Sequence, residues 1–204
     1  MDNRRRMMSS KKTPSLNGVY IEATNGKLFT AKKWTGSLTP NSVVVISNGV
    51  SFRIALTQSS DLMKIHSSYY GTLERYMTAF SDAPSAKLDR QSAENTANIM
   101  KVQSGTGYAA GYCNAYLFPD GKTKGLLPAL GWLWTAYDNK SAVDACLAAC
   151  GATAMDTTEP HWSSTFWGVN IIYRRCWVLN WSDGSLSYGN LSNIARVRPF
   201  AEYN

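Results

Sequence analysis

The chain has 204 residues, of which 44% are hydrophobic, 12% aromatic and 17% charged. This much apolar side-chain area can offset the entropy lost when the chain orders, which excludes a disordered polypeptide and indicates one main core. The formal net charge is +7, but five basic residues and one acidic residue lie within residues 1–14, which leaves +3 for the remainder. A body of such modest charge does not predict a nucleic-acid-binding surface.

Residues 1–14 carry the run RRRMMSSKKTP and are predicted to form a basic, solvated tail. The same tail would alternatively suit docking on an acidic partner or a larger assembly. No uninterrupted apolar stretch reaches the roughly 20 residues that a bilayer requires, so we expect no membrane insertion. The basic residues are not followed by an apolar segment, and the sequence therefore shows no recognisable secretory signal.

Residues 15–58 are predicted to form a β-hairpin region that serves assembly or attachment. GVYIEA and KLFTA flank Thr24-Asn25-Gly26, and VVVIS and VSFRIAL flank Asn48-Gly49. Asn-Gly between two apolar runs is a strong short-range signal for a hairpin, because both turn residues need a positive φ.

The middle of the chain is predicted to be helical. Residues 69–80 and 86–102 contain few β-branched runs, and Pro84 marks a helix start between them. Two further short helices are expected in LLPALGWLWTAYDN (126–139) and KSAVDACLAACG (140–151). Asp138-Asn139 would form their junction, and Gly151 the cap after the second helix.

Strand-like segments return in the last third as HWSSTFW (161–167), CWVLNW (176–181) and ARVRPF (195–200). Asp183-Gly184 is expected to form a tight turn between strands. Strands followed by helices and then by strands again predict an α+β protein with an antiparallel sheet.

Cysteine and histidine residues give no sign of a metal site or of a cofactor. Cys113, Cys146, Cys150 and Cys176 are too few and too unevenly spaced for a disulfide framework, and the pair in DACLAACG shares a helical face typical of a core. The two histidines, His66 and His161, have no partner at metal-ligand spacing and are predicted to be structural or solvated.

Catalytic motifs fail on inspection. Gly121-Lys122-Thr123 ends like a phosphate-binding loop, but Tyr116 stands where that motif needs glycine, and PDG at 119–121 is better interpreted as a turn. The sequence contains neither a GxSxG elbow nor an HExxH helix, and its acidic residues are scattered. We therefore predict that the protein is not an enzyme.

Four segments in the second half carry a resemblance to a known family. WSST (162–165), WVLNWSDG (177–184) and VRPF (197–200), preceded by DGKTKGLLPALG (120–131), resemble the variable proteins of diversity-generating retroelements, which include phage tropism determinants. The resemblance covers roughly residues 105–204. It implies a C-type lectin-like fold, shared with the formylglycine-generating enzymes, here with antiparallel strands and two or more short helices. The ligand-display domain would span residues 59–204, with a variable region at about 162–200.

In that family, reverse transcription rewrites adenines near the 3′ end of the gene, so AAY codons become NNY codons. NNY codons never encode Lys, Glu, Gln, Met or Trp. From Trp162 to Phe200 none of the first four occurs, whereas they make up 25 of the 161 residues before Trp162. About six would be expected by composition, and their chance absence is on the order of one in a thousand. Trp167 does not fit this pattern and is interpreted as scaffold, or as a position with a different template codon.

The resemblance implies a division of the last third into scaffold and display. WSST, the strand from Trp177 to Trp181, SDG and VRPF would be fixed scaffold, while FWGVNIIYRRC and SYGNLSNI would form the displayed surface. Aromatic residues and arginine, which dominate binding hot spots, are frequent there. The alternative is that Val169, Ile171 and Ile172 form a buried strand. The candidate ligand-binding residues are Phe166, Trp167, Asn170, Ile172, Tyr173, Arg174, Arg175, Asn180, Tyr188, Asn190, Leu191 and Asn193.

The sequence departs from the calcium-dependent lectins. Glu159-Pro160-His161 has histidine where those proteins carry an amide ligand, and no cluster of oxygen ligands is visible, so calcium-mediated sugar binding is not expected. The formylglycine-generating enzymes use a reactive cysteine pair. Cys176 lies in the segment FWGVNIIYRRC, and Cys113 is far from it in sequence. We therefore do not expect this protein to have that activity.

These inferences predict a non-enzymatic receptor-binding or adhesion protein in a phage tail or on a cell surface, without a cofactor. Its partner would be a protein or glycan receptor on a target cell, and display as a homo-oligomer, such as a trimer, would strengthen weak monovalent binding. Two alternatives remain: a catalyst of the formylglycine-generating type, and a fixed structural subunit of a phage or pilus. Fold analogy does not decide between them.

Overall fold

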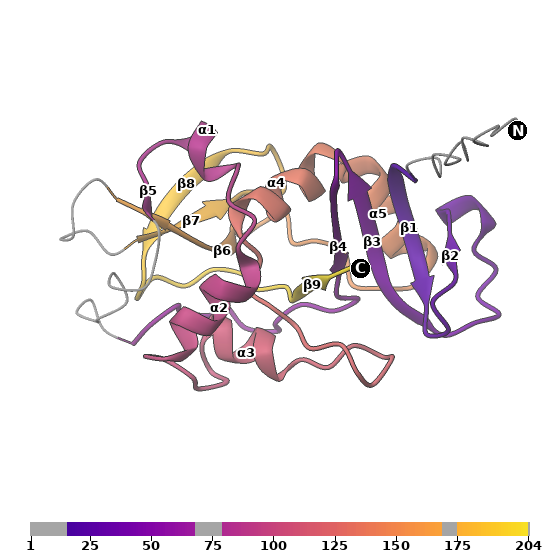
Figure 1. The fold of residues 1–204 in the computed structure, drawn as a ribbon, viewed down its shortest axis with the longest axis horizontal. Helices are drawn as coiled ribbons and strands as arrows, with labels where there is room; N and C mark the ends of the chain where they lie inside the picture. The colour runs from indigo at the N-terminus through magenta and orange to yellow at the C-terminus, as the bar shows by residue number, and fades with distance from the viewer. Residues whose placement is uncertain (1–15, 68–78, 169–174, 204) are drawn as a thin grey trace, which may run out of the picture.

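Two β-sheets lie at opposite ends of an elongated molecule (Figure 1). The computed structural model describes residues 16–67, 79–168 and 175–203. The five-stranded sheet has the order β2-β1-β3-β4-β9, and the four-stranded sheet has the order β5-β6-β7-β8. The first sheet comprises β1 (Gly18–Ala23), β2 (Leu28–Phe29), β3 (Pro40–Ser47), β4 (Val50–Ile54) and β9 (Phe200–Glu202).

Both predicted hairpins are confirmed. β3 and β4 pair antiparallel up to Ser47 and Val50, and the turn residues Asn48 and Gly49 have φ values of 50° and 79°. Two positive φ values are what a tight two-residue hairpin needs, because they match the twist of the flanking strands. β1 and β2 also pair antiparallel around the turn that contains Gly26.

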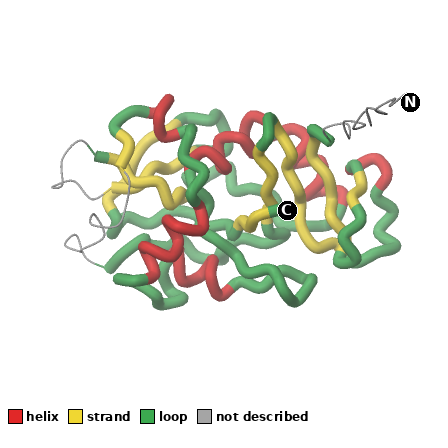
Figure 2. The backbone as a smooth tube through the Cα atoms, viewed as in Figure 1, coloured by secondary structure: helices red, strands yellow, loops and turns green. Residues whose placement is uncertain are grey.

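The two helices predicted from residues 126–151 are confirmed as α4 (Leu130–Asp138) and α5 (Lys140–Ala149). Gly151 has a φ of 69° just after α5, as expected of a cap glycine. α5 packs against β1 and β3, whereas α4 packs against β6 and β7. α4 and α5 therefore lie between the strands of the two sheets, where Figure 2 shows helical backbone in red.

The earlier helical region departs from prediction. α1 (Ala83–Ala86) has Pro84 in its first turn as expected, but the chain then turns before α2 (Ser92–Met100), so 86–102 is not one helix. The expected helix at 69–80 lies outside the described residues except at its end, where Ala79 and Phe80 form β5 and the prediction is wrong. β5 pairs parallel with β6, and this long-range contact overrides local propensity. α3 (Ala109–Ala115) was not predicted.

The second sheet contains β6 (His161–Trp167), β7 (Arg175–Leu179) and β8 (Leu186–Asn190), which pair antiparallel in sequence order. The predicted strand at 161–167 is confirmed. The prediction at 195–200 is correct only at Phe200, because Ala195 and Arg196 form isolated bridges. β8 was not predicted as a strand, and most of it falls in SYGNLSNI, which was expected to be displayed surface. The Asp183-Gly184 turn between β7 and β8 is confirmed, with a φ of 73° at Gly184.

The predicted boundary at residue 58 does not separate two parts of the fold. β9, near the C-terminus, pairs with β4, and one core cluster contains Val19 and Phe52 together with Leu147 and Trp181. The strands between residues 18 and 54 therefore share a core with the C-terminal part of the chain. The α+β class with antiparallel sheets is confirmed. No helix among the described residues has the length and apolar character needed to cross a membrane.

A buried ion pair crosses the five-stranded sheet. Glu22 on β1 is 3% exposed, and its carboxylate accepts hydrogen bonds from Arg53 Nε at 2.8 Å and Nη2 at 2.9 Å. Asn41 and Ser42 on β3 donate to the same carboxylate at 2.8 and 2.7 Å. Burial alone would raise the pKa of Glu22, but these hydrogen bonds outweigh it and hold the pKa below its ordinary value.

Replacing Glu22 by Gln should lower the free energy of unfolding by about 3 kcal/mol, because it leaves the guanidinium of Arg53 buried without a counter-ion. Urea unfolding of E22Q beside the unmodified protein measures the loss. The control is Lys140→Gln, which removes the more exposed pair between Lys140 and Asp144 and should cost less than about 1 kcal/mol. Equal losses in the two variants would contradict a stabilising role for the buried pair.

Candidate ligand-binding surface

The WSST segment anchors β6 in the core. Trp162 is 1% exposed and donates from Nε1 to the carbonyl of Met63 at 2.7 Å. Ser163 Oγ donates to the carbonyl of Trp177 at 2.7 Å, and Thr165 Oγ1 donates to Asp89 Oδ2 at 2.6 Å. Each residue of WSST is buried, so the expectation that this segment is internal scaffold agrees with its placement.

The other expected scaffold segments are also internal, apart from the turn. Trp177 and Trp181 are 5% and 0% exposed, and Val197 and Phe200 are fully buried. Trp181 Nε1 donates to Asp144 Oδ1 at 3.1 Å on α5, which ties the end of β7 to a helix of the first core cluster. Ser182 and Asp183 form the exposed tip of the β7–β8 turn.

Strand register separates the residues of β6, β7 and β8 onto two faces. Arg175 pairs with Trp167 on one side and with Asn190 on the other, and Trp177 pairs with Tyr188. Because side chains alternate along a strand, these five side chains share one face, and Phe166 and Cys176 project from the other. Trp177 is buried, whereas Trp167, Arg175 and Asn190 are half-buried and Tyr188 is 42% exposed.

Trp167, Arg175, Tyr188 and Asn190 form a compact group, named here the Arg175 cluster. The rings of Trp167 and Tyr188 stack with centroids 4.0 Å apart and planes 21° from parallel. The guanidinium carbon of Arg175 lies 5.2 Å from the centroid of Trp167 and 5.1 Å from that of Tyr188. Arg175 Nε donates to Asn190 Oδ1 at 3.1 Å. These contacts hold a cation and two aromatic rings in a defined arrangement before any ligand arrives.

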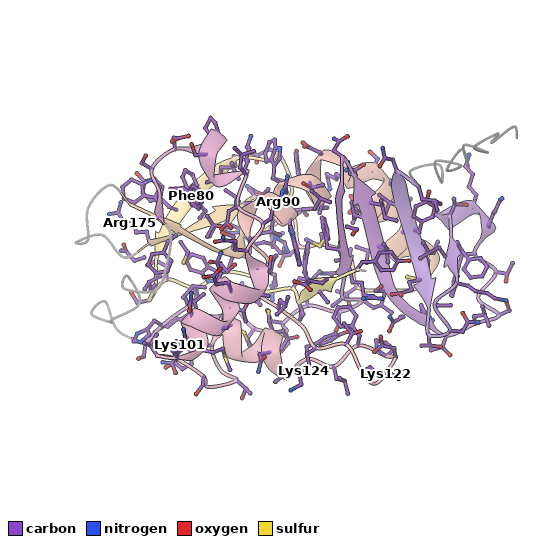
Figure 3. The ribbon with its side chains drawn as sticks, viewed as in Figure 1. Phe80, Arg90, Lys101, Lys122, Lys124 and Arg175 are labelled. Carbon is purple, nitrogen blue, oxygen red and sulfur yellow. The ribbon has the colours of Figure 1, made fainter. Side chains whose placement is uncertain are left out.

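Trp177 and Phe80, which are not among the predicted ligand-binding residues, support this cluster. Trp177 meets Tyr188 edge to face at 5.9 Å and donates from Nε1 to the carbonyl of Phe80 at 3.2 Å. Phe80 on β5 pairs with Trp167. Figure 3 places Phe80 and Arg175 at the end of the molecule opposite the five-stranded sheet. No local sequence signal connects Phe80 to this site, because a parallel pairing between distant segments creates the contact.

Asn180 and Asn193 lie outside the Arg175 cluster. Asn180 lies at the far end of β7, where its Oδ1 accepts from Ser182 N at 3.1 Å and Ser182 Oγ at 2.9 Å to hold the turn. Asn193 is exposed in the turn after β8, and its backbone N–H donates to the carbonyl of Asn190. Four candidates lie outside the described residues, namely Asn170, Ile172, Tyr173 and Arg174.

The expectation of display is wrong for Phe166 and Leu191. They are 3% and 0% exposed, and both belong to the second core cluster with Trp162 and Val178. Strand alternation turns Phe166 inward beside Cys176, and Leu191 is buried where its carbonyl accepts from the N–H groups of Ile65 and His66. Aromatic and aliphatic types alone do not distinguish a binding surface from a core.

Cys113, Cys146, Cys176 and His161 are buried, and Cys150 is half-buried. Burial raises the pKa of Cys113 and Cys176 well above the ordinary thiol value, and raises that of Cys146 to about 11. His161 is 1% exposed, and neither ring nitrogen has a hydrogen-bond partner among the described residues. Burial, together with the nearby charge of Arg198, lowers the pKa of His161 to about 3. The expectation that His161 is structural agrees with this position.

Comparisons with known proteins found no matching family model, no matching curated protein and no matching solved structure.

Replacing Phe166 by Ser should lower the free energy of unfolding by about 3–5 kcal/mol, since it removes a buried ring and inserts an unpaired hydroxyl. The matched variant Tyr188→Ser lies on the opposite face and should cost about 1 kcal/mol or less. Urea unfolding of both variants checks the two-face assignment. A large loss at Tyr188 with none at Phe166 would overturn it.

His161 should make the protein less stable in mild acid. The unfolded chain binds a proton near the ordinary pKa of 6.5, whereas the folded chain resists protonation down to about 3. The free energy of unfolding should therefore fall as pH drops below about 6.5, with a slope approaching 1.4 kcal/mol per pH unit. Depressed carboxylate pKa values, such as those of Asp156 and Glu22, add to this loss only nearer pH 4.

Urea unfolding between pH 7 and pH 5 isolates the contribution of His161. The charged groups that bear on its pKa are Arg198, Asp156 and Arg196, and they stay charged across this range. His161→Leu should flatten the slope, whereas His66→Leu, which leaves His161 in place, should keep it. A slope that His161→Leu does not change would contradict the assignment.

Proposed function

We propose that the protein is a non-enzymatic receptor-binding or adhesion protein that presents the Arg175 cluster to a protein or glycan on a target cell. The observation that carries this proposal is the contrast within one sheet. Two stacked aromatic rings and a guanidinium are partly exposed on one face of the sheet, whereas Phe166, Cys176 and Val178 are buried on the opposite face of β6 and β7. Tyr, Trp and Arg in a preordered group are the residue types that contribute most to protein interfaces.

We further propose that the fold is C-type lectin-like and that the protein is the variable protein of a diversity-generating retroelement, carried on a phage tail or a cell surface. The antiparallel strands and the short helices are the coarse features that the resemblance implied. The absence of Lys, Glu, Gln and Met from Trp162 to Phe200 supports codon rewriting. The protein would still fold after such rewriting, because the exposed positions contribute little to the core and the scaffold residues are buried.

The catalytic alternative is less well supported. An enzyme of the formylglycine-generating type would need reactive thiols, which carry a low pKa and are reachable by substrate. Cys113 and Cys176 are fully buried, and burial raises the pKa of each. The structural-subunit alternative requires the exposed face of Tyr188 to be covered by a neighbour, and homo-oligomeric display would instead leave it open for avid binding.

The decisive experiment sequences the DNA around the gene from a growing population. We expect a near-copy of the codons for residues 162–200 beside a reverse-transcriptase gene, differing mainly where the copy carries adenines. Population variation should fall on the codons of Arg175, Tyr188, Asn190 and Asn193, and the internal control codons of Trp162 and Trp177 should be constant. An invariant 3′ end without a near-copy would exclude active diversification and favour a fixed-specificity adhesin or a structural subunit.

A further inference from the structure

β8 is the longest edge strand that the structure describes. The five-stranded sheet ends in β2 and β9, and the four-stranded sheet ends in β5 and β8. β2 and β5 have two residues each and β9 has three, whereas β8 has five. Very short edge strands offer little backbone for a further strand to pair with, so β8 alone among these edges is long enough to accept one.

The hydrogen-bond pattern shows which backbone groups of β8 face outward. Asn180 N donates to the carbonyl of Ser185 at 3.0 Å, and Leu179 pairs with Leu186. Because bonded and non-bonded pairs alternate in an antiparallel ladder, Ser187 and Gly189 direct their N–H and C=O groups toward β7. Leu186 and Tyr188 then direct theirs away from it. Neither makes a backbone hydrogen bond to any other segment within the described part of the chain.

The sequence of β8 lacks the usual protection of an edge. Natural proteins blunt exposed edges with charged residues, proline or a bulge. LSYGN contains no charge and no proline, and its pairing with β7 runs in unbroken register from Leu186 to Asn190. Ser187 and Tyr188 are exposed at its centre. An open, uncharged and regular edge is suited to pairing with another strand.

We propose that β8 binds an extended segment of a partner polypeptide as an added strand, so that backbone pairing provides affinity and the Arg175 cluster provides specificity. The inference rests on the proposed function and narrows its receptor to a polypeptide. Leu186 and Tyr188 would each exchange hydrogen bonds with the partner strand, as bonded pairs do. The partner side chain opposite Tyr188 would lie on the face of the Arg175 cluster. An aromatic or acidic residue suits that position, beside an exposed ring and a guanidinium.

Amide hydrogen exchange on the full chain tests the backbone pairing. The probe is a peptide selected on the protein from a displayed library of random linear peptides about ten residues long. In the free protein, the amides of Leu186 and Tyr188 should exchange quickly, whereas those of Ser187 and Gly189 should be protected. Binding of the selected peptide should protect Leu186 and Tyr188 and leave the other two unchanged.

A matched pair of variants separates the backbone from the side chain. Leu186→Pro and Leu186→Ala both remove the leucine side chain, but only proline also removes the outward N–H. We expect peptide binding to be at least about tenfold weaker in L186P than in L186A. If L186P does not fold, a synthetic segment of residues 176–204 can be ligated through Cys176 to the rest of the chain. This segment carries an N-methyl group on the backbone nitrogen of Tyr188, which removes the outward N–H. That protein keeps the tyrosine ring, and its affinity is compared with that of the unmethylated ligated protein.

The outcomes distinguish this inference from the function on which it rests. If Tyr188→Ala weakens binding of the selected peptides but loss of the outward N–H groups does not, strand addition is overturned and the proposed binding surface is retained. A library that yields no peptide, or only peptides indifferent to Tyr188, would overturn both. Protection of Leu186 and Tyr188 without peptide, together with a concentration-dependent dimer in sedimentation, would show that a second copy of the chain occupies β8, which also overturns the inference.

Discussion

The hydrogen bond between Thr165 and Asp89 is the contact on which the arrangement of the second sheet depends. Thr165 Oγ1 donates to Asp89 Oδ2 at 2.6 Å and accepts from the backbone N–H of Leu130 at 2.7 Å. Asp89 also accepts from Asn95 at 2.9 Å. One strand residue thereby joins β6 to the beginning of α4 and to α2. Buried polar groups are costly when unpaired, so these three elements must take up their positions together.

This anchoring explains how a binding surface and a core can share one strand. With β6 held by its buried hydroxyl groups, Phe166 has to enter the second core cluster and Trp167 has to leave it. The same alternation turns Cys176 into the core and places Arg175 on the opposite face, beside Asn190. Exposed side chains on the face of the Arg175 cluster, such as Tyr188, can then differ without creating cavities in the core, because their own burial contributes little to stability. A scaffold of this kind suits a protein whose contacts vary.

The two ends of the molecule differ in structure. The Glu22–Arg53 pair rigidifies the five-stranded sheet, which contains the first strand of the chain, β1 (Figure 1). The Arg175 cluster and β8 lie in the sheet at the other end, and α4 and α5 pack between the two sheets. Attachment through one end would therefore leave the other free to meet a target, and several copies attached side by side would gain avidity.

Local signals in the sequence determined the elements whose conformation depends on their own residues. Asn48-Gly49 and Asp183-Gly184 specified turns, with positive φ at Asn48 and at both glycines. Gly151 marked the end of α5, and the strand-like segment at 161–167 specified β6. The α+β class followed from the order of these elements. Tertiary structure alone decided which aromatic residues are exposed. Phe166 and Trp167 are adjacent and chemically alike, yet strand register buries one and leaves the other half-exposed. It also decided that β9 completes the N-terminal sheet and that Phe80 supports Trp167, because both pairings join segments far apart in the chain.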